Sequence, residues 1–103
     1  MEDFEEVKEK TIVKAIRRYL DQAFPGVWYK IHGGPYQEAG IPDIVGVYKG
    51  QFCAFEVKRP AKRDNVTLNQ QYQLDRLKAA GAITGVVTSV EEVKKIMIME
   101  AQK

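Results

Sequence analysis

Two short runs of strand-forming residues, separated by a dipeptide, constrain the fold of this chain most strongly. Residues 44–48 (Ile-Val-Gly-Val-Tyr) and 51–55 (Gln-Phe-Cys-Ala-Phe) are rich in β-branched and aromatic side chains, and the Lys-Gly link between them suits a tight turn. We therefore expect an antiparallel hairpin. Successive side chains of a strand point to opposite faces, so Glu56 and Lys58, which continue the second run, point the same way.

Charged residues gather at one end of this predicted hairpin. The dipeptide Pro42-Asp43 opens the first strand, and Glu56, Val57 and Lys58 close the second. Two carboxylates and an ammonium group on one edge of a small sheet are costly for stability alone, but a divalent metal and a phosphate would use them. The alternative is structural: Asp43 caps a turn, and Glu56 and Lys58 form an edge-strand ion pair. The Pro-Asp dipeptide ahead of the first strand favours the metal site.

Such a site suits phosphodiester hydrolysis. The reaction needs an attacking water, a stabiliser for the charged transition state and a route for the leaving oxyanion, and a carboxylate-bound Mg²⁺ can meet all three needs. Mg²⁺ prefers oxygen ligands and keeps several waters, so two or three carboxylates suffice. Asp43 and Glu56 fit that role, and Lys58 can orient the water or neutralise developing negative charge. We expect Mn²⁺ to substitute for Mg²⁺.

The remaining sequence predicts three helices and two further strands. Apolar periodicity and turn residues place the helices over 4–23, 68–80 and 90–99 and the strands over 27–31 and 83–88. The segment 32–42, rich in glycine and proline, is expected to be a loop. Thr67 and Ser89 each suit the N-cap of the helix that follows.

Helical spacing also predicts which side chains are buried. In the first helix they are Ile12, Val13, Ile16, Leu20 and Phe24. In the second they are Gln70 (or Gln71), Leu74, Leu77 and the stem of Lys78. In the last they are Val93, Ile96, Met97 and, less centrally, Val90.

The element order is therefore α-β-β-β-α-β-α, which defines an α/β fold class. The first three strands can form an antiparallel meander. The strand after the second helix must return by a crossover, which favours a parallel neighbour and a right-handed connection. We expect a mixed β-sheet flanked by helices.

Composition limits the classes of protein to consider. With 103 residues, we expect residues 1–103 to form a single domain. The net charge of +2 does not by itself indicate a nucleic-acid partner, and the apolar runs are too short to cross a bilayer. The acidic first residues are unlike a signal peptide, and the single cysteine, Cys53, suits a reducing compartment, so we expect a cytoplasmic protein without membrane contacts. Cys53 lies on the strand face opposite Glu56 and is interpreted as a core residue.

The order of these motifs resembles a known family. Gly40-Ile41-Pro42-Asp43 followed by Glu56-Val57-Lys58 resembles the PD-(D/E)xK nuclease signature. More closely, the chain from Glu9 to about Val93 is similar to a stand-alone VRR-NUC (virus-type replication-repair nuclease) domain, which implies a restriction-endonuclease-like sheet. The other matching segments are Glu9-x-x-Ile12, Ala15-Ile16, Tyr19-Leu20, Lys30-Ile31-His32-Gly33, Thr67-x-x-Gln70, Leu74, Leu77, Gly81, Val86-Val87 and Ser89-Val90-Glu91-Glu92.

The resemblance implies a role for each matching residue. The metal ligands would be Asp43, Glu56, the backbone carbonyl of Val57 and the helix acid Glu9. Lys58 would be the catalytic lysine, and Gln70 would support the site from the following helix. Two alternatives stay open: Glu5 or Glu6, one turn earlier, could replace Glu9, and Gln70 could simply be a polar residue at a helix N-terminus.

Further residues are expected to contact nucleic acid. Four cations lie at or just beyond the end of the second strand, and next to a nuclease site we expect Arg59, Lys62 and Arg63 to contact DNA phosphates. Their alternative is a solvated loop. Tyr36 in the glycine-rich loop could stack on a base or lie along the backbone, and Lys30 is a further expected contact. The single histidine, His32, is interpreted as structural rather than catalytic.

The function predicted is a Mg²⁺-dependent endonuclease that acts on branched DNA such as four-way (Holliday) junctions. The family resemblance implies a homodimer and a phage or prophage origin, with the protein in a bacterial or phage-infected cell, and two identical sites would match a two-fold junction. The last helix, with Met97 and Met99, is one candidate for the dimer interface. Two alternatives are a general repair or restriction-type nuclease, and a non-catalytic DNA-binding module on a nuclease scaffold.

Overall fold

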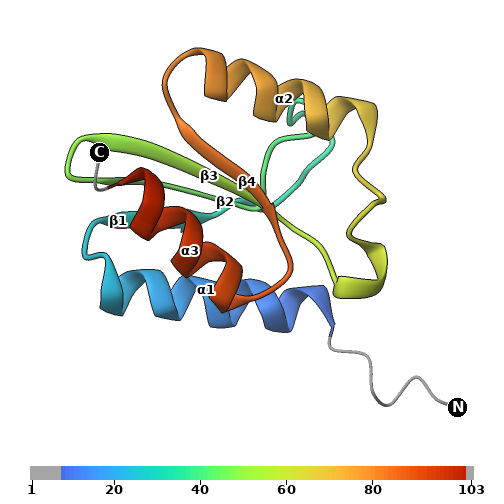
Figure 1. Ribbon diagram of the computed structural model, residues 1–103. Helices are drawn as coiled ribbons and strands as arrows, with labels where there is room; N and C mark the ends of the chain where they lie inside the picture. The colour runs from blue at the N-terminus through green and yellow to red at the C-terminus, as the bar shows by residue number, and fades with distance from the viewer. Residues whose placement is uncertain (1–7, 102–103) are drawn as a thin grey trace, which may run out of the picture.

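The computed structural model describes residues 8–101 and has the predicted order of elements (Figure 1). The helices and strands are α1 (Glu9–Ala23), β1 (Val27–Lys30), β2 (Ile44–Tyr48), β3 (Gln51–Val57), α2 (Leu68–Ala79), β4 (Ile83–Val87) and α3 (Val90–Glu100). A short 3₁₀ helix, η2 (Pro60–Lys62), lies between β3 and α2. No helix in this part of the chain is both long enough and apolar enough to cross a membrane.

The strands form one mixed sheet in the order β1-β2-β3-β4. β1 pairs antiparallel with β2, β2 antiparallel with β3, and β3 parallel with β4, as the crossover through α2 predicted. The β2–β3 turn has positive φ at both Lys49 (49°) and Gly50 (80°), as a two-residue hairpin turn that follows the twist of the strands requires.

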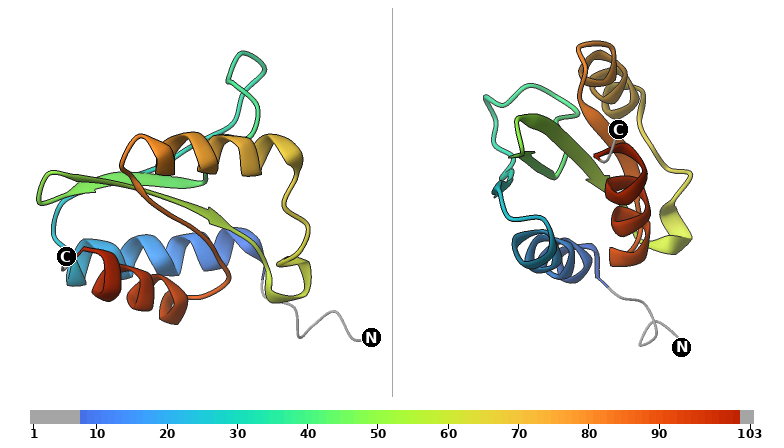
Figure 2. Two further views of the ribbon diagram at one scale, coloured as in Figure 1. Left: turned by 45° about the horizontal axis from the view of Figure 1, so that its top comes forward. Right: turned by 60° about the vertical axis from the view of Figure 1, so that its left-hand side comes forward.

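Helices cover both faces of the sheet, and the core lies mainly on one of them. Figures 1 and 2 show α1 and α3 side by side on one face and α2 on the other. The five apolar positions predicted for the first helix are all buried. They pack with residues of β1, β2, β3, β4 and α3, including Trp28, Ile44, Phe55, Val57, Val87, Val93 and Met97.

Two details of the helices differ from the prediction. Lys8 is extended and precedes α1, so the predicted start at residue 4 is wrong; residues 4–7 lie outside the described part of the chain. Lys8 and Glu9 are exposed, and the packing of α1 against the sheet begins only at Ile12.

The predicted buried stripe of α2 is also partly wrong. Leu74 is buried as expected and Leu77 is half-buried, but Gln71 and Lys78 are exposed. The second buried side chain of α2 is Gln73, which bonds to the loop between β1 and β2. That contact joins distant segments, so helical periodicity did not reveal it.

This loop is packed tightly where it approaches α2. Gly40 has φ of 82°, and a Cβ atom there would lie 2.4 Å from the carbonyl oxygen of Asn69. Only glycine tolerates both the backbone conformation and the close approach. The contact holds the Gly-Ile-Pro-Asp turn against the start of α2, which fixes the position from which Asp43 enters β2.

Candidate functional site

Asp43 is held in place by bonds to two neighbouring strands. Its carbonyl oxygen accepts a hydrogen bond of 2.8 Å from the N–H of Ile31, just beyond β1. Its side-chain Oδ2 accepts another of 2.8 Å from the N–H of Val57, the last residue of β3. The carboxylate is therefore oriented toward the end of the strand that carries Glu56.

Glu56 is the most informative side chain of the group. It is only 3% exposed, and its Oε1 atom is buried without a hydrogen-bond partner. The Nζ atom of Lys58 lies 4.0 Å from Oε2 of Glu56, and the lysine side chain is itself mostly buried. The structure thus brings together Asp43, Glu56 and Lys58, the three residues that the hairpin pattern predicted.

Burial and the nearby Asp43 change the protonation of Glu56. The pKa of Glu56 is raised to about 8, first by burial and then by the charge of Asp43 and a side-chain hydrogen bond with it. The charge of Glu9 raises this pKa further, and that of Lys58 lowers it. A buried carboxyl with such a pKa is mostly protonated at neutral pH, so a bound cation would have to displace this proton.

Glu9 belongs to the same electrostatic group. It is the first residue of α1, and its pKa is raised above 4.5 by partial desolvation and by the charge of Asp43, while the charge of Lys58 lowers it. The predicted helix acid therefore lies within electrostatic reach of Asp43, Glu56 and Lys58. Glu5 and Glu6, the alternatives, lie outside the described residues.

The donor set fits a hard divalent cation. Within residues 8–101, no three His, Cys, Asp or Glu side chains gather closely enough to enclose a metal by themselves. Mg²⁺ does not need such a cage, because it keeps several waters and takes one or two carboxylates. The unpartnered Oε1 of Glu56 is a free oxygen ligand beside Asp43, and the backbone carbonyl of Val57 stays the third predicted donor.

Gln70 has a structural task at the start of α2. Its side-chain Oε1 accepts a bond of 3.0 Å from the N–H of Thr67, and its own N–H donates to Thr67 Oγ1 over 3.1 Å. This capping box agrees with the interpretation of Gln70 as a polar residue at a helix N-terminus, which the sequence left open beside support of the metal site. Support of the metal site by Gln70 stays a prediction.

Gln73 is a residue that the sequence analysis missed. It is buried, and its Nε2 donates to Glu38 Oε2 at 3.2 Å and to the carbonyl of Ala39 at 3.3 Å. Arg76 also lies 3.4 Å from Glu38. These bonds anchor the loop that delivers Asp43, but no motif separated Gln73 from the neighbouring glutamines.

The basic segment after β3 is not uniform. Lys62 is exposed and Arg59 is half-buried. The guanidinium of Arg63 forms an ion pair with Glu92 of α3 and donates to Thr88 Oγ1 at 3.3 Å. Arg63 therefore has a structural partner, whereas Lys62 is exposed at the end of η2.

Other predicted residues lie around the site. Tyr36 is 99% exposed on the β1–β2 loop, so its ring is accessible to a base. His32 is exposed on the same loop. Lys30 ends β1 beside Ile44, the residue after Asp43. Cys53 is fully buried and burial raises its pKa to about 11, which agrees with a core residue rather than a nucleophile.

Comparison with known proteins supports the resemblance at the level of structure. No protein-family model matches the chain, and no curated protein does. A solved structure described as "VRR_NUC domain" superposes with a TM-score of 0.65 and 25% sequence identity, over 89% of this chain and 95% of that one. The mixed sheet flanked by helices is restriction-endonuclease-like, and the likeness over nearly the whole of both chains supports a VRR-NUC domain with a nuclease-type fold.

Proposed function

We propose that this chain is a Mg²⁺-dependent endodeoxyribonuclease. The observation that carries the proposal is the buried carboxyl of Glu56, whose Oε1 atom has no hydrogen-bond partner although Asp43 and Lys58 lie beside it. A buried polar atom without a partner is destabilising unless a ligand satisfies it. A divalent cation would do so and would also relieve the repulsion between the carboxylates.

Each side chain has a distinct task in the proposed reaction. Asp43, Glu56, the Val57 carbonyl and Glu9 would hold the metal, and the bond from Val57 N–H to Asp43 Oδ2 keeps that carboxylate oriented. When bound, Mg²⁺ would activate water and offset charge on the phosphate. Lys58 places an ammonium group beside Glu56, where it can orient the attacking water and stabilise negative charge on the phosphoryl oxygens.

The preferred substrate is proposed to be branched DNA, cut by a homodimer in the cytoplasm of a bacterial or phage-infected cell. Two copies related by a two-fold axis would present two equivalent sites to a four-way junction. The last helix offers less apolar surface for pairing than predicted, because Met97 is fully buried and, of the large apolar residues of α3, only Ile98 and Met99 are exposed.

The outer face of the sheet supports the homodimer better. Val27, Tyr29, Val47 and Phe52 are all exposed, and their strand pairing places them on one face. Helix α2 packs on β3 and β4 rather than on β1. Exposed apolar residues that lie together are typical of a protein interface, and we propose a second copy of this chain as the partner.

Cleavage assays test this function directly. Labelled four-way junction and a linear duplex of matched sequence are incubated with protein in Mg²⁺, Mn²⁺ or EDTA. We expect metal-dependent cutting that is faster on the junction. Binding without cutting would favour the non-catalytic module, and equal cutting of both substrates would favour a general repair or restriction-type nuclease.

A further inference from the structure

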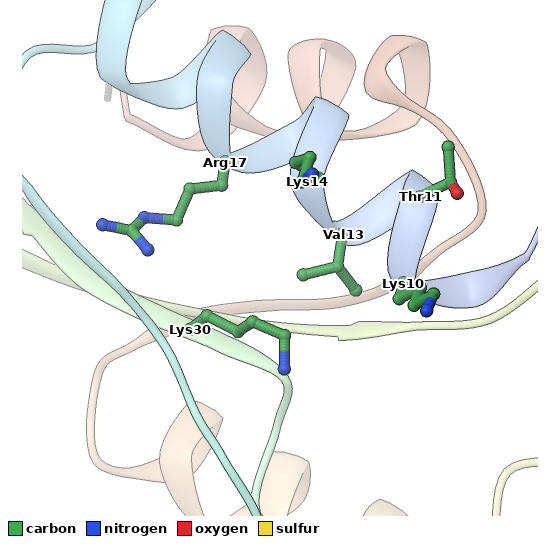
Figure 3. Close-up of a pocket in the computed structure, with 6 residues that line it drawn as sticks. All are labelled: Lys10, Thr11, Val13, Lys14, Arg17 and Lys30. Carbon is green, nitrogen blue, oxygen red and sulfur yellow. The ribbon is translucent and has the colours of Figure 1, made fainter.

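A basic groove, which no motif of the sequence indicated as a whole, lies between α1 and the β1 edge of the sheet. It has a volume of about 510 Å³, and Figure 3 shows the residues that line it: Lys10, Thr11, Val13, Lys14, Arg17 and Lys30. Five come from α1 and one from the end of β1. Four of these six residues are cationic and none is acidic.

The cations of the groove have no ion-pair partner among residues 8–101. Within the described part of the chain, Lys10, Lys14, Arg17 and Lys30 make no ion pair, and the buried Nε atom of Arg17 has no hydrogen-bond acceptor. On α1, Lys14 follows Lys10 by four residues and precedes Arg17 by three, and like charges at these spacings destabilise a helix. Their gathering therefore points to a ligand that carries negative charge.

Two residues that line the groove are adjacent, along the chain or across the sheet, to segments that carry the candidate metal site. Lys10 directly follows Glu9, and Lys30 pairs with Ile44, the residue after Asp43. The next residue of that loop, Ile31, donates to the carbonyl of Asp43. A strand bound with one phosphate at Asp43 and Glu56 could thus continue along the groove.

We propose that this groove binds the sugar-phosphate backbone of DNA next to the phosphate that is cut. The inference rests on the proposed nuclease function and adds Lys10, Thr11, Lys14 and Arg17 to the DNA-binding surface. The planar guanidinium of Arg17 suits two phosphate oxygens, and the lysines supply point charges. The hydroxyl of Thr11 can donate to a phosphate, and Val13 provides an apolar floor for sugar rings.

Salt-dependent binding tests the groove without relying on cleavage. Affinity for a fluorescent duplex is measured by anisotropy in EDTA, between about 50 and 200 mM salt. The groove variant is Lys14→Gln with Arg17→Gln, and the matched control is Lys78→Gln with Lys94→Gln, which removes the same charge from exposed helix positions. We expect the groove variant to bind at least tenfold more weakly and its log–log salt slope to fall by about two, one for each lost phosphate contact.

A second double variant controls for misfolding of the first. Arg17 is half-buried, so Lys10→Gln with Lys14→Gln, both exposed, repeats the measurement, and circular dichroism checks the fold of each protein. Equal effects of groove and control variants on the salt slope would overturn the proposal. Calorimetry with inorganic phosphate gives a second check. A groove variant that no longer binds phosphate but keeps its affinity for the duplex would also overturn the proposal.

The outcomes separate this inference from the proposed function. If wild type cuts DNA and the groove variants keep the wild-type salt slope, the groove is not a DNA contact although the nuclease function stands. If wild type binds without cutting and the groove variants bind weakly, the groove is supported although the nuclease function fails. Absence of DNA binding by wild type would overturn both.

Discussion

The main-chain N–H of Val57 donates a 2.8 Å hydrogen bond to the side-chain Oδ2 of Asp43. This bond joins the entry to β2 with the end of β3, fourteen residues later in the chain. It fixes Asp43 beside Glu56 before any ligand arrives. The same carboxylate is thus both a structural acceptor and a proposed metal ligand, and substitutions can separate these two roles.

Replacing Asp43 should affect stability and activity differently according to the substitute. Asp43→Ala leaves the N–H of Val57 without its acceptor, which should lower the free energy of unfolding by about 1–3 kcal/mol. Asp43→Asn retains an oxygen acceptor and should lose less stability, yet both variants should lose cleavage and keep DNA binding. Urea unfolding and a cleavage assay of the two variants provide the measurement, and activity in either would refute the ligand role of Asp43.

The raised pKa of Glu56 predicts how stability depends on pH without metal. Folding raises this pKa from 4.5 to about 8, so the folded state binds a proton that the unfolded state releases. The stabilisation from that proton is fully present below about pH 4.5 and is lost as the pH rises through about 8. Urea unfolding in EDTA across this range should therefore show stability that falls with pH, and Glu56→Gln should flatten the decline. An equally steep decline in the variant would contradict the raised pKa of Glu56 as the cause of the pH dependence.

Lys58→Ala should reduce the rate of cleavage rather than the affinity for DNA. The ammonium group lies beside Glu56 and faces the proposed reaction centre, and removal of one such charge-stabilising group typically lowers kcat by about 10²- to 10³-fold. Single-turnover cleavage at saturating protein measures the rate, and anisotropy measures binding. A change confined to KM would mean that Lys58 only grips a phosphate.

The two glutamines of α2 should differ in their effects. Gln70→Ala removes half of the capping box and should lower the free energy of unfolding by roughly 1 kcal/mol. Gln73→Ala should loosen the β1–β2 loop, because it removes the bonds to Glu38 and Ala39, and hydrogen exchange of residues 32–42 should become faster. If Gln70→Ala abolished cleavage without loss of stability, the support role implied by the family would be right instead.

Lys62 and Arg63, both in the basic segment after β3, should differ in their effects, because Lys62 is exposed and Arg63 pairs with Glu92. Lys62→Gln should weaken DNA binding and lower the salt slope by about one, because Lys62 is exposed and four residues after Lys58 in the chain. Arg63→Gln breaks the ion pair with Glu92 and should instead lower stability by roughly 1 kcal/mol or less, since the pair is partly exposed. Equal salt slopes for wild type and Lys62→Gln would mean that the segment is a solvated loop.

Local sequence was enough to predict the hairpin and the residues at its end. Strand alternation and the Lys-Gly turn act over a few residues, so Glu56 and Lys58 could be placed on one face before the structure was known. The crossover through α2 favoured a parallel neighbour for β4, and this prediction was confirmed. These features depend on neighbours in the chain.

Contacts between distant segments were not predictable in the same way. Gln73 and Glu38 are 35 residues apart, and Arg63 and Glu92 are 29 apart. The groove between α1 and β1 likewise depends on how the helix sits on the sheet edge. Each depends on the packing of whole elements, which periodicity along one element does not encode.

Binding of Mn²⁺ tests most directly whether Asp43 and Glu56 form a divalent-metal site. Electron paramagnetic resonance of free Mn²⁺, titrated against folded wild type and against Glu56→Gln, measures how much metal each protein binds. We expect wild type to bind Mn²⁺ and Glu56→Gln to bind it much more weakly, because the variant replaces the buried carboxylate, whose Oε1 atom has no other partner, by a neutral amide with a single oxygen. Equal binding by the two proteins, or none by wild type, would contradict the metal site on which the proposed nuclease function rests.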